Sequence, residues 1–195
     1  MLDTHARKMV QPLFEYAAGA CIRLKLSPNF LTLLSFGIGL STGVFVYFGY
    51  PFVAVAMLWL SGLFDVLDGT VARRTGTSSA LGTVMDVTFD RIVELSVVLG
   101  VAFRSPDIAV YLLFLTSAII ISMTVFLTVA AVAEKSGVKS FYYQAGVAER
   151  TEGFIFFSLM VLLPGHAWWI TLIFAAVIFF TAGQRFHEAV RLLGK

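Results

Sequence analysis

The sequence predicts an all-α integral membrane protein: six transmembrane helices preceded by an N-terminal amphipathic helix in the membrane interface. Hydrophobic residues make up 58% of the 195-residue chain, and the mean hydropathy is +0.88. This is more apolar than an ordinary soluble domain. Long apolar stretches recur along the chain, and turn-forming residues separate them. Together these observations exclude a soluble globular fold.

Six apolar stretches approach the 20 or so residues that a helix needs to cross a bilayer. They are residues 29–49, 52–73, 80–103, 107–133, 152–164 with a short flank, and 167–187. Before them, residues 3–25 mix basic and apolar side chains, a pattern typical of an interfacial helix. We therefore expect a single membrane-embedded domain over residues 1–195, with the interfacial helix in 1–27 and the six-helix bundle in 28–195.

The basic residues indicate the orientation of these helices. With both termini in the cytoplasm, 13 of the 14 lysines and arginines lie in cytoplasmic segments or helix ends, and only Arg104 lies outside. We expect a cell-membrane protein without a cleaved signal peptide, since residues 1–25 lack a continuous apolar segment. The net charge of +2 gives no reason to expect nucleic-acid binding, and the single Cys21 excludes an internal disulfide.

Four aspartates stand at fixed spacing within this apolar sequence. The pattern is Asp65-x-x-Asp68-Gly69-x-x-Ala72-Arg73, eight residues, then Gly82-x-x-x-Asp86-x-x-x-Asp90. A carboxylate at the bilayer centre costs about 2.5–3.5 kcal/mol, so these four must face one another, water or a metal. Spacings of three and four place each pair on one face of its helix. Two antiparallel helices joined by a short turn can then present all four to one cytoplasmic pocket.

Such a cluster is suited to hard divalent cations. Clustered carboxylates repel one another unless cations neutralise them, and Mg²⁺ or Mn²⁺ prefers oxygen ligands. Two ions held together form a clamp for displacement at a phosphoryl group. Gly69 would let a phosphate approach the backbone, and Arg73 and Arg74 would pair with a pyrophosphate. Gly82 would let the two helices pack tightly.

At every fixed position, this pattern resembles the signature of the CDP-alcohol phosphotransferase (CDP-alcohol phosphatidyltransferase) family, and Ser27-Pro28-Asn29-x-x-Thr32 extends the likeness. The resemblance implies an enzyme of phospholipid headgroup synthesis that faces the cytoplasm. A small alcohol attacks the lipid-linked phosphorus of a CDP-lipid, and CMP is released. It also implies two divalent cations, Mg²⁺ or Mn²⁺, as cofactors, and a homodimer among membrane lipids.

Carried over by position, the resemblance implies roles for individual residues. Asp65, Asp68 and Asp86 would bind the metals. Asp90 would touch the second metal and act as the base toward the acceptor hydroxyl. The residues implied at the CDP-lipid pocket are Asn29, Thr32, Asp65, Gly69, Ala72, Arg73 and Ser79.

The acceptor alcohol is indicated by a departure from the family pattern. Members that use phosphorylated polyols carry an arginine four residues before a glutamate late in the fourth transmembrane helix. Here Ala130 stands four residues before Glu134. This favours an uncharged or zwitterionic acceptor such as serine. Arg150 and Arg185 are candidate acceptor-site residues that keep inositol phosphate or glycerol 3-phosphate as an alternative.

Other classes of membrane protein also use intramembrane carboxylates. A prenyltransferase would be larger and would carry two aspartate motifs far apart, whereas all four aspartates here lie within residues 65–90. An intramembrane divalent-cation transporter is the hypothesis from another class. It leaves Gly69, Arg73 and Gly82 unexplained, and the chain shows no inverted repeat. The intact Asp90 disfavours a catalytically inactive scaffold.

Overall fold

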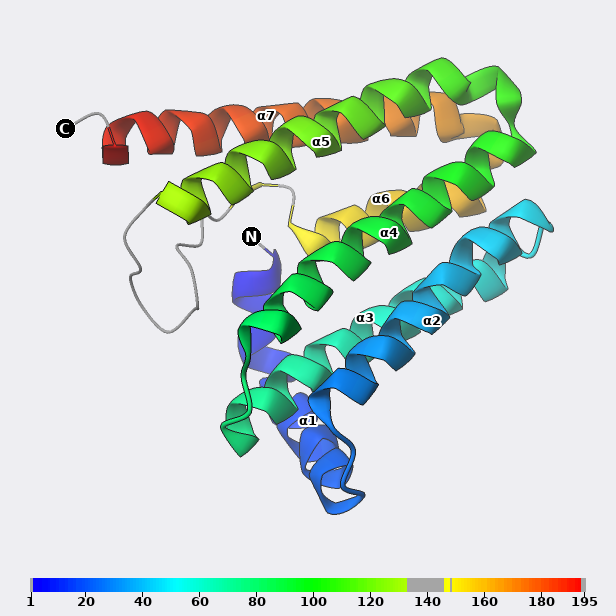
Figure 1. Cartoon of the computed structure of the whole chain (residues 1–195). Coiled ribbons are helices and arrows are strands. Elements are labelled where there is room, and N and C mark those ends of the chain that lie inside the picture. The colour runs from blue at the N-terminus through cyan, green and yellow to red at the C-terminus, as the bar shows by residue number, and fades with distance from the viewer. Residues whose placement is uncertain (1, 133–145, 148, 194–195) are drawn as a thin grey trace. The chain divides into compact units, whose positions relative to one another are not determined.

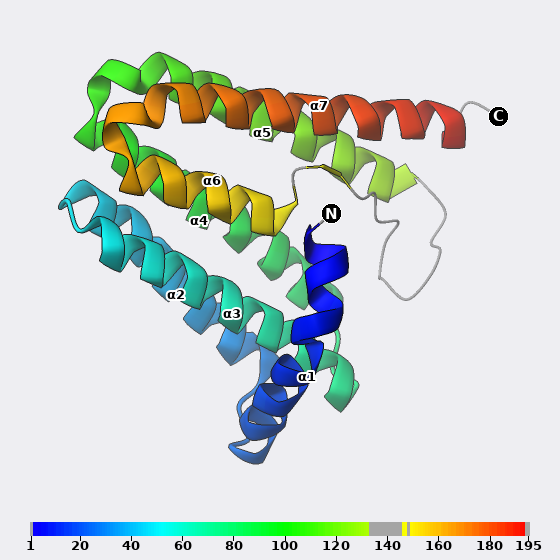
Figure 2. The ribbon, with the colours of Figure 1, turned by 180° about the vertical axis from the view of Figure 1, so that it is seen from behind.

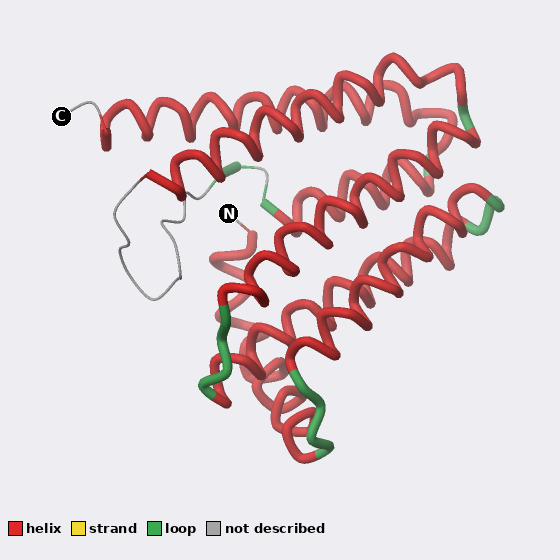
Figure 3. The backbone as a smooth tube through the Cα atoms, viewed as in Figure 1, coloured by secondary structure: helices red, strands yellow, loops and turns green. Residues whose placement is uncertain are grey.

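The computed structural model describes residues 2–132, 146, 147 and 149–193, and every regular element within them is a helix (Figures 1 and 3). The α-helices are α1 (Leu2–Arg23), α2 (Pro28–Tyr47), α3 (Pro51–Thr75), α4 (Ala80–Arg104), α5 (Ala109–Val132), α6 (Arg150–Leu162) and α7 (Ala167–Leu193). Two 3₁₀ turns, η1 (Pro106–Ile108) and η2 (Pro164–His166), precede α5 and α7. The chain divides into two compact units, one with α1 to α4 and the other with α5 to α7. One domain over residues 1–195 stays a prediction.

Each apolar stretch predicted from the sequence contains a helix, but among the described residues only four spans are long and apolar enough to cross a membrane. These are Pro28–Tyr47, Pro51–Thr75, Pro106–Val132 and Pro164–Leu193. Helix α4 is as long as α3, yet four charged side chains lie between its residues 86 and 94. Helix α6 has 13 residues, about 20 Å at 1.5 Å per residue, against a hydrocarbon core of roughly 30 Å. Six crossings therefore remain a prediction.

Local signals set the ends of the helices that carry the aspartates. Helix α3 begins at Pro51 and ends at Thr75, and the next residue, Gly76, adopts the left-handed conformation with φ of 66°. Ser79 then caps α4, because its Oγ accepts a hydrogen bond of 3.0 Å from the Gly82 amide. Only residues 76–79 separate the two helices. This short turn places the end of α3 near the start of α4.

Helices α2 and α4 approach each other so closely that their backbones touch. A Cβ added at Gly43 would stand 2.1 Å from the carbonyl oxygen of Ser96, and one added at Gly100 would stand 2.5 Å from the carbonyl oxygen of Gly43. The stacked rings of Phe36 and Phe89, with centroids 4.1 Å apart, continue this contact. Gly43 of α2 therefore meets two small residues of α4 that are four positions apart, Ser96 and Gly100, and these residues form the crossing.

The prediction that Gly82 lets α3 and α4 pack tightly is wrong. A Cβ at this position would meet only Ser79 Oγ, at 3.2 Å, and no described atom of α3 lies within 4 Å of it. The reason is that Gly82 lies in the first turn of α4, beside the residue that caps the helix. The close crossing belongs to α2 and α4 instead, around Gly43 and Gly100.

Gly43→Ala is expected to lower the free energy of unfolding by about 1–3 kcal/mol, the usual cost of overpacking. The added Cβ would overlap the Ser96 carbonyl, which belongs to the backbone and cannot rotate away. Thermal unfolding in detergent measures the change. Gly37→Ala is the matched control, because α2 has open space there and alanine favours a helix over glycine. Equal stability of the two variants would contradict the crossing.

Helix α1 packs one face against α2 and α3 and leaves another exposed. Ala18 is fully buried in a cluster with Leu31 of α2 and with Leu67 and Val71 of α3. On the exposed face lie the large apolar side chains of Leu13 and Tyr16, and the exposed Leu24 follows directly after the helix. This two-sided pattern suits a helix in a membrane interface, which stays a prediction from the sequence.

In the other compact unit, α7 packs along α5 and also contacts α6 (Figure 2). The Phe157 ring of α6 lies fully buried and meets Phe174 of α7 edge-on, with centroids 5.2 Å apart. The apolar side chains of Leu113 and Phe180 remain exposed on the surface. A surface of this kind fits helices surrounded by lipid rather than water.

Candidate active site

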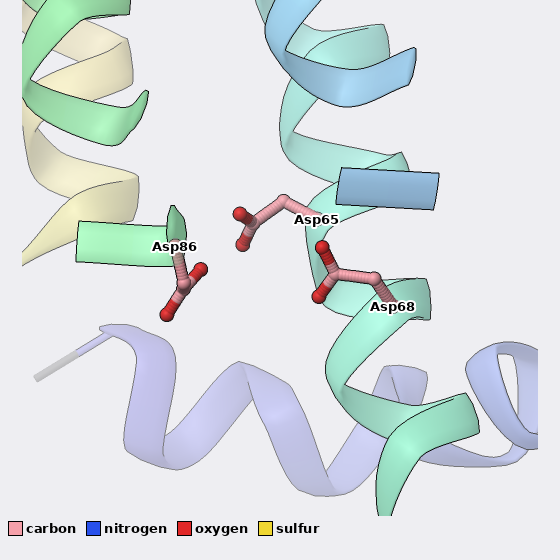
Figure 4. Close-up of side chains that lie close together, drawn as sticks. All are labelled: Asp65, Asp68 and Asp86. Carbon is pink, nitrogen blue, oxygen red and sulfur yellow. The ribbon is translucent and has the colours of Figure 1, made fainter. Parts of the chain in front are cut away.

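Three aspartates from two helices converge at one place in the unit of α1 to α4 (Figure 4). Asp65 and Asp68 come from α3 and Asp86 comes from α4, and one carboxylate oxygen of each lies within 4.8 Å of the others. Asp68 is buried and the other two are half-buried. Cluster formation by Asp65, Asp68 and Asp86, predicted from their spacing, is therefore confirmed.

The fourth aspartate, Asp90, lies one helical turn further along α4 than Asp86. It is not among the three residues whose oxygens lie within 4.8 Å of one another. Its charge nevertheless interacts with those of Asp86 and Asp68. Asp90 therefore lies beside the three converging carboxylates, and its roles as metal ligand and base stay predictions.

The cluster has the properties of a site for a divalent cation. Asp68 Oδ2 is buried and has no hydrogen-bond partner among the described residues, and an unsatisfied buried carboxylate oxygen is costly. The neighbouring carboxylates add repulsion. Oxygen ligands without histidine or cysteine are what Mg²⁺ or Mn²⁺ prefers. A hard divalent cation would satisfy the orphaned oxygen and neutralise the cluster, so these residues fit the predicted metal.

The residues predicted at the CDP-lipid pocket on α3 line the turn just after the cluster. Arg73 reaches back along the helix, where its Nη2 donates to Thr70 Oγ1 at 3.2 Å. A Cβ added at Gly69 would stand 3.2 Å from Arg73 Nη1. The missing side chain at Gly69 therefore leaves the room that the guanidinium uses. Ala72, beside Arg73, is half-buried.

The other predicted pocket residues lie at helix starts. Asn29 is exposed in the first turn of α2. Thr32 is buried one turn later, where its hydroxyl donates to the Pro28 carbonyl at 3.0 Å and lies in hydrogen-bonding reach of Asp68. Ser79 is exposed and caps α4. Thr32 thus lies beside the cluster, whereas the contact of Ser79 with the Gly82 amide caps the helix.

Arg150 and Arg185, the candidate acceptor residues, belong to the unit of α5 to α7. Arg185 of α7 is 8% exposed, and its Nη1 donates to Ser122 Oγ of α5 at 3.2 Å. Its guanidinium also lies 4.9 Å from the centre of the Phe126 ring. Arg150, the first residue of α6, lies 5.4 Å from the centre of the Phe154 ring. The structure describes Ala130, but Glu134 lies outside the described residues.

Sequence reasoning missed an ion pair beside the catalytic candidate. On α4, Arg91 Nη1 lies 2.6 Å from Glu94 Oε2, three residues along the same helix. The i, i+3 spacing of opposite charges in an apolar segment could have revealed it. This pair extends the charged face of α4 by one turn beyond Asp90.

The comparison with known families decides what this site belongs to. The model of the CDP-alcohol phosphatidyltransferase family matches residues 25–183. The chain belongs to this family. The match includes all four aspartates and Arg150, and it ends two residues before Arg185. As a member of this family, the chain is a phosphotransferase that transfers substituted phosphate groups.

Similar proteins in this phosphatidyltransferase family come from bacteria and archaea. The chain is 32% identical over 196 residues to inner membrane protein YnjF of Escherichia coli, covering 95% of this chain and 93% of that protein. It is 30% identical over 190 residues to archaetidylinositol phosphate synthase of Methanothermobacter thermautotrophicus, covering 92% and 87%.

The fold resembles that of phosphatidylinositol phosphate synthase from Mycobacterium tuberculosis. The structure of that enzyme with CDP-DAG bound gives a TM-score of 0.75 at 23% identity, covering 94% of this chain and 96% of that one. Its structure with manganese and citrate also gives a TM-score of 0.75, at 22% identity, covering 93% and 90%. The fold is therefore shared, and the predicted divalent-cation cofactor agrees with the family and with the aspartate cluster.

Proposed function

We propose that this phosphatidyltransferase moves the phosphatidyl group, or its ether-lipid counterpart, from a CDP-lipid to the hydroxyl of a small alcohol and releases CMP. The observation that carries the proposal is the convergence of Asp65, Asp68 and Asp86 within 4.8 Å, with Asp90 one turn away on α4. The CDP-DAG bound to the mycobacterial enzyme of the same fold supports a CDP-lipid as the donor. Homodimerisation and the cytoplasmic orientation of the site remain predictions from the sequence.

The donor is held by its pyrophosphate at the end of α3. Divalent cations bound by Asp65, Asp68 and Asp86 would neutralise the pyrophosphate and stabilise the charge on departing CMP. Arg73 adds a cation on the same turn, and Gly69 allows close approach to the backbone. The acyl chains can stay in the bilayer while the nucleotide enters from the aqueous side.

Asp90 is proposed as the base that activates the acceptor. Its carboxylate takes the proton of the acceptor hydroxyl as the acceptor oxygen forms a bond to the lipid-linked phosphorus. The bond between that phosphorus and the CMP oxygen breaks, and CMP leaves with the electron pair. A position one turn from the three-aspartate cluster gives Asp90 access to a second reactant beside the bound donor.

A phosphorylated polyol is the favoured acceptor. Several relatives are named phosphatidylinositol phosphate or archaetidylinositol phosphate synthases, so the preference for serine derived from Ala130 loses support. Arg185 supports the same choice, because Ser122 and Phe126 hold its buried guanidinium in place. A pre-oriented guanidinium suits a phosphate monoester.

An uncharged alcohol is the second candidate, and one observation favours it. Ser122, Phe126 and Ala130 follow one another at four-residue intervals on α5. Ala130 therefore continues the helix face that Arg185 contacts, and it supplies no second cation there. Family members that use phosphorylated polyols carry an arginine at the position of Ala130, so this chain would hold an acceptor phosphate with one cation fewer.

The test measures CMP release by the purified protein with CDP-diacylglycerol and Mn²⁺ or Mg²⁺. Inositol phosphate, glycerol 3-phosphate, inositol, glycerol and serine are supplied singly. We expect release with a phosphorylated polyol, and Arg185→Gln should lower kcat/KM for it by about 10- to 150-fold, the equivalent of a lost charged hydrogen bond. His187→Gln, two residues further along α7, is the matched control.

Release with serine or another uncharged alcohol, unaffected by Arg185→Gln, would favour the second candidate. In that case Ala130→Arg should introduce activity with a phosphorylated polyol. Metal binding without CMP release from any acceptor would contradict the proposed function and favour the transporter hypothesis.

A further inference from the structure

Two consecutive arginines end α3, and they point to different partners. Arg73 turns back along its own helix toward Thr70. Arg74 instead reaches α1, where its Nη1 donates to the main-chain carbonyl of Glu15 at 2.7 Å. Successive residues differ by about 100° around a helix, which is why the two side chains separate. Arg73 therefore stays on the face of α3 that holds Thr70, whereas Arg74 holds the neighbouring helix α1.

The contact between Arg74 and α1 has several parts. Glu15 Oε2 lies 3.5 Å from the same Nη1, and Gln11 Nε2 donates to the other carboxylate oxygen of Glu15 at 2.9 Å. One turn further on, Gly19 leaves room, since a Cβ there would already stand 3.6 Å from Arg74 Nη1. The guanidinium therefore lies along the α1 backbone at a glycine and bonds to it by a charge-assisted hydrogen bond.

The same part of α1 packs beneath the turns of α3 that carry the cluster. Ala18 is fully buried against Leu67 and Val71. Leu67 directly precedes Asp68, and Val71 lies one turn further along α3. In Figure 4, the ribbon of α1 runs across the view below the three labelled carboxylates. Helix α1 thus contacts α3 both by apolar packing and through Arg74.

We infer that Arg74 is a positioning residue that fixes α1 to the last turn of α3 and so sets the placement of the donor site. This inference rests on the proposed function. The exposed apolar face of α1, with Leu13 and Tyr16 on the helix and Leu24 just after it, seats this helix at a lipid surface. A CDP-lipid must place its acyl chains in that surface and its pyrophosphate at Gly69 and Arg73 at the same time. The contact of Arg74 with α1, called the clamp below, keeps the lipid-facing surface of α1 aligned with the pyrophosphate site at Gly69 and Arg73.

Arg74→Gln should therefore raise the KM for CDP-diacylglycerol about tenfold, the equivalent of a weak charged hydrogen bond, with kcat nearly unchanged. Glu15→Gln should have little effect, because the shorter bond goes to the main-chain carbonyl, which this variant keeps. Arg74→Lys should recover part of the loss. Arg23→Gln is the matched control, since it removes an exposed cation at the end of α1.

A second measurement separates the clamp from direct binding of the pyrophosphate by Arg74. A nitroxide at the exposed position 16, introduced as Tyr16→Cys in a Cys21→Ala background, reports the mobility of α1 by electron paramagnetic resonance. Arg74→Gln should increase the mobility of this label in the absence of donor, and Arg23→Gln should not.

An increase in KM without a change in label mobility would overturn the clamp and assign Arg74 to the donor directly. Unchanged KM and unchanged mobility would show that the contact positions nothing. If the unmodified enzyme released no CMP, the proposed function would fail, while the label would still report whether Arg74 holds α1. The two failures are therefore distinguishable.

Discussion

Asp90→Asn is expected to lower CMP release by about 10²- to 10⁴-fold, the usual contribution of a general base, while donor binding is largely kept. Asparagine has nearly the same shape as aspartate but cannot accept the acceptor's proton. Asp90 is not one of the three aspartates whose oxygens lie within 4.8 Å of one another, so the donor and its metal should still bind to the variant. Steady-state CMP release together with equilibrium binding of CDP-diacylglycerol measures both parts.

The matched control is Asp107→Asn, an equivalent change at an exposed aspartate in η1. It should leave both turnover and binding unchanged. Normal turnover by Asp90→Asn would show that the base is assigned wrongly. A loss of donor or metal binding in parallel with turnover would instead make Asp90 mainly a ligand.

Asp68→Asn is expected to weaken Mn²⁺ binding by about a hundredfold or more. Even mutations of residues that only hydrogen-bond to a metal ligand lower metal affinity by about 10- to 100-fold. Asp68 is the most buried member of the cluster, and its Oδ2 has no hydrogen-bond partner among the described residues. The amide removes the charge and one of the two oxygens that would hold the cation. A titration with Mn²⁺, monitored by the electron paramagnetic resonance signal of the free ion, measures the affinity.

Stability gives a readout of the same variant that is independent of activity. At 100 times its dissociation constant, Mn²⁺ should stabilise the unmodified protein by about 2.7 kcal/mol, and at the same concentration it should stabilise Asp68→Asn by about 0.4 kcal/mol or less. In EDTA, Asp68→Asn should be more stable than the unmodified protein, because the variant has less repulsion among the carboxylates at positions 65, 68 and 86. An unmodified protein that unfolds at the same temperature with and without Mn²⁺ would argue against a metal at this cluster.

The candidate site was the part of this protein most accessible from sequence. The i, i+3 spacing of Asp65 and Asp68 places them on one face of a helix. The cap at Ser79 and the short turn after Gly76 return the chain beside that face at Asp86. All of these are local properties, set within a few residues by helical geometry and turn chemistry. The prediction succeeded because the site is built from one helical hairpin.

The helix crossings were not accessible in the same way. Gly82 is part of the family signature, yet it faces the cap of its own helix, whereas Gly43 and Gly100 let the backbones of α2 and α4 touch. Which glycine meets a partner depends on how two separate helices are rotated against each other. That rotation is a property of packing between distant segments, and a spacing within one helix does not specify it.

The sequence by itself determined the helical membrane class, the aspartate cluster and the family chemistry, because hydropathy and residue spacing act over short distances along the chain. Only the tertiary structure decided that Asp65, Asp68 and Asp86 lie closest together with Asp90 beside them, that Arg185 is buried against Ser122 and Phe126, and that Arg74 holds Glu15. The last two contacts join residues about 60 positions apart in the sequence. Such contacts arise only when whole helices pack, since each depends on where a side chain from another segment comes to lie.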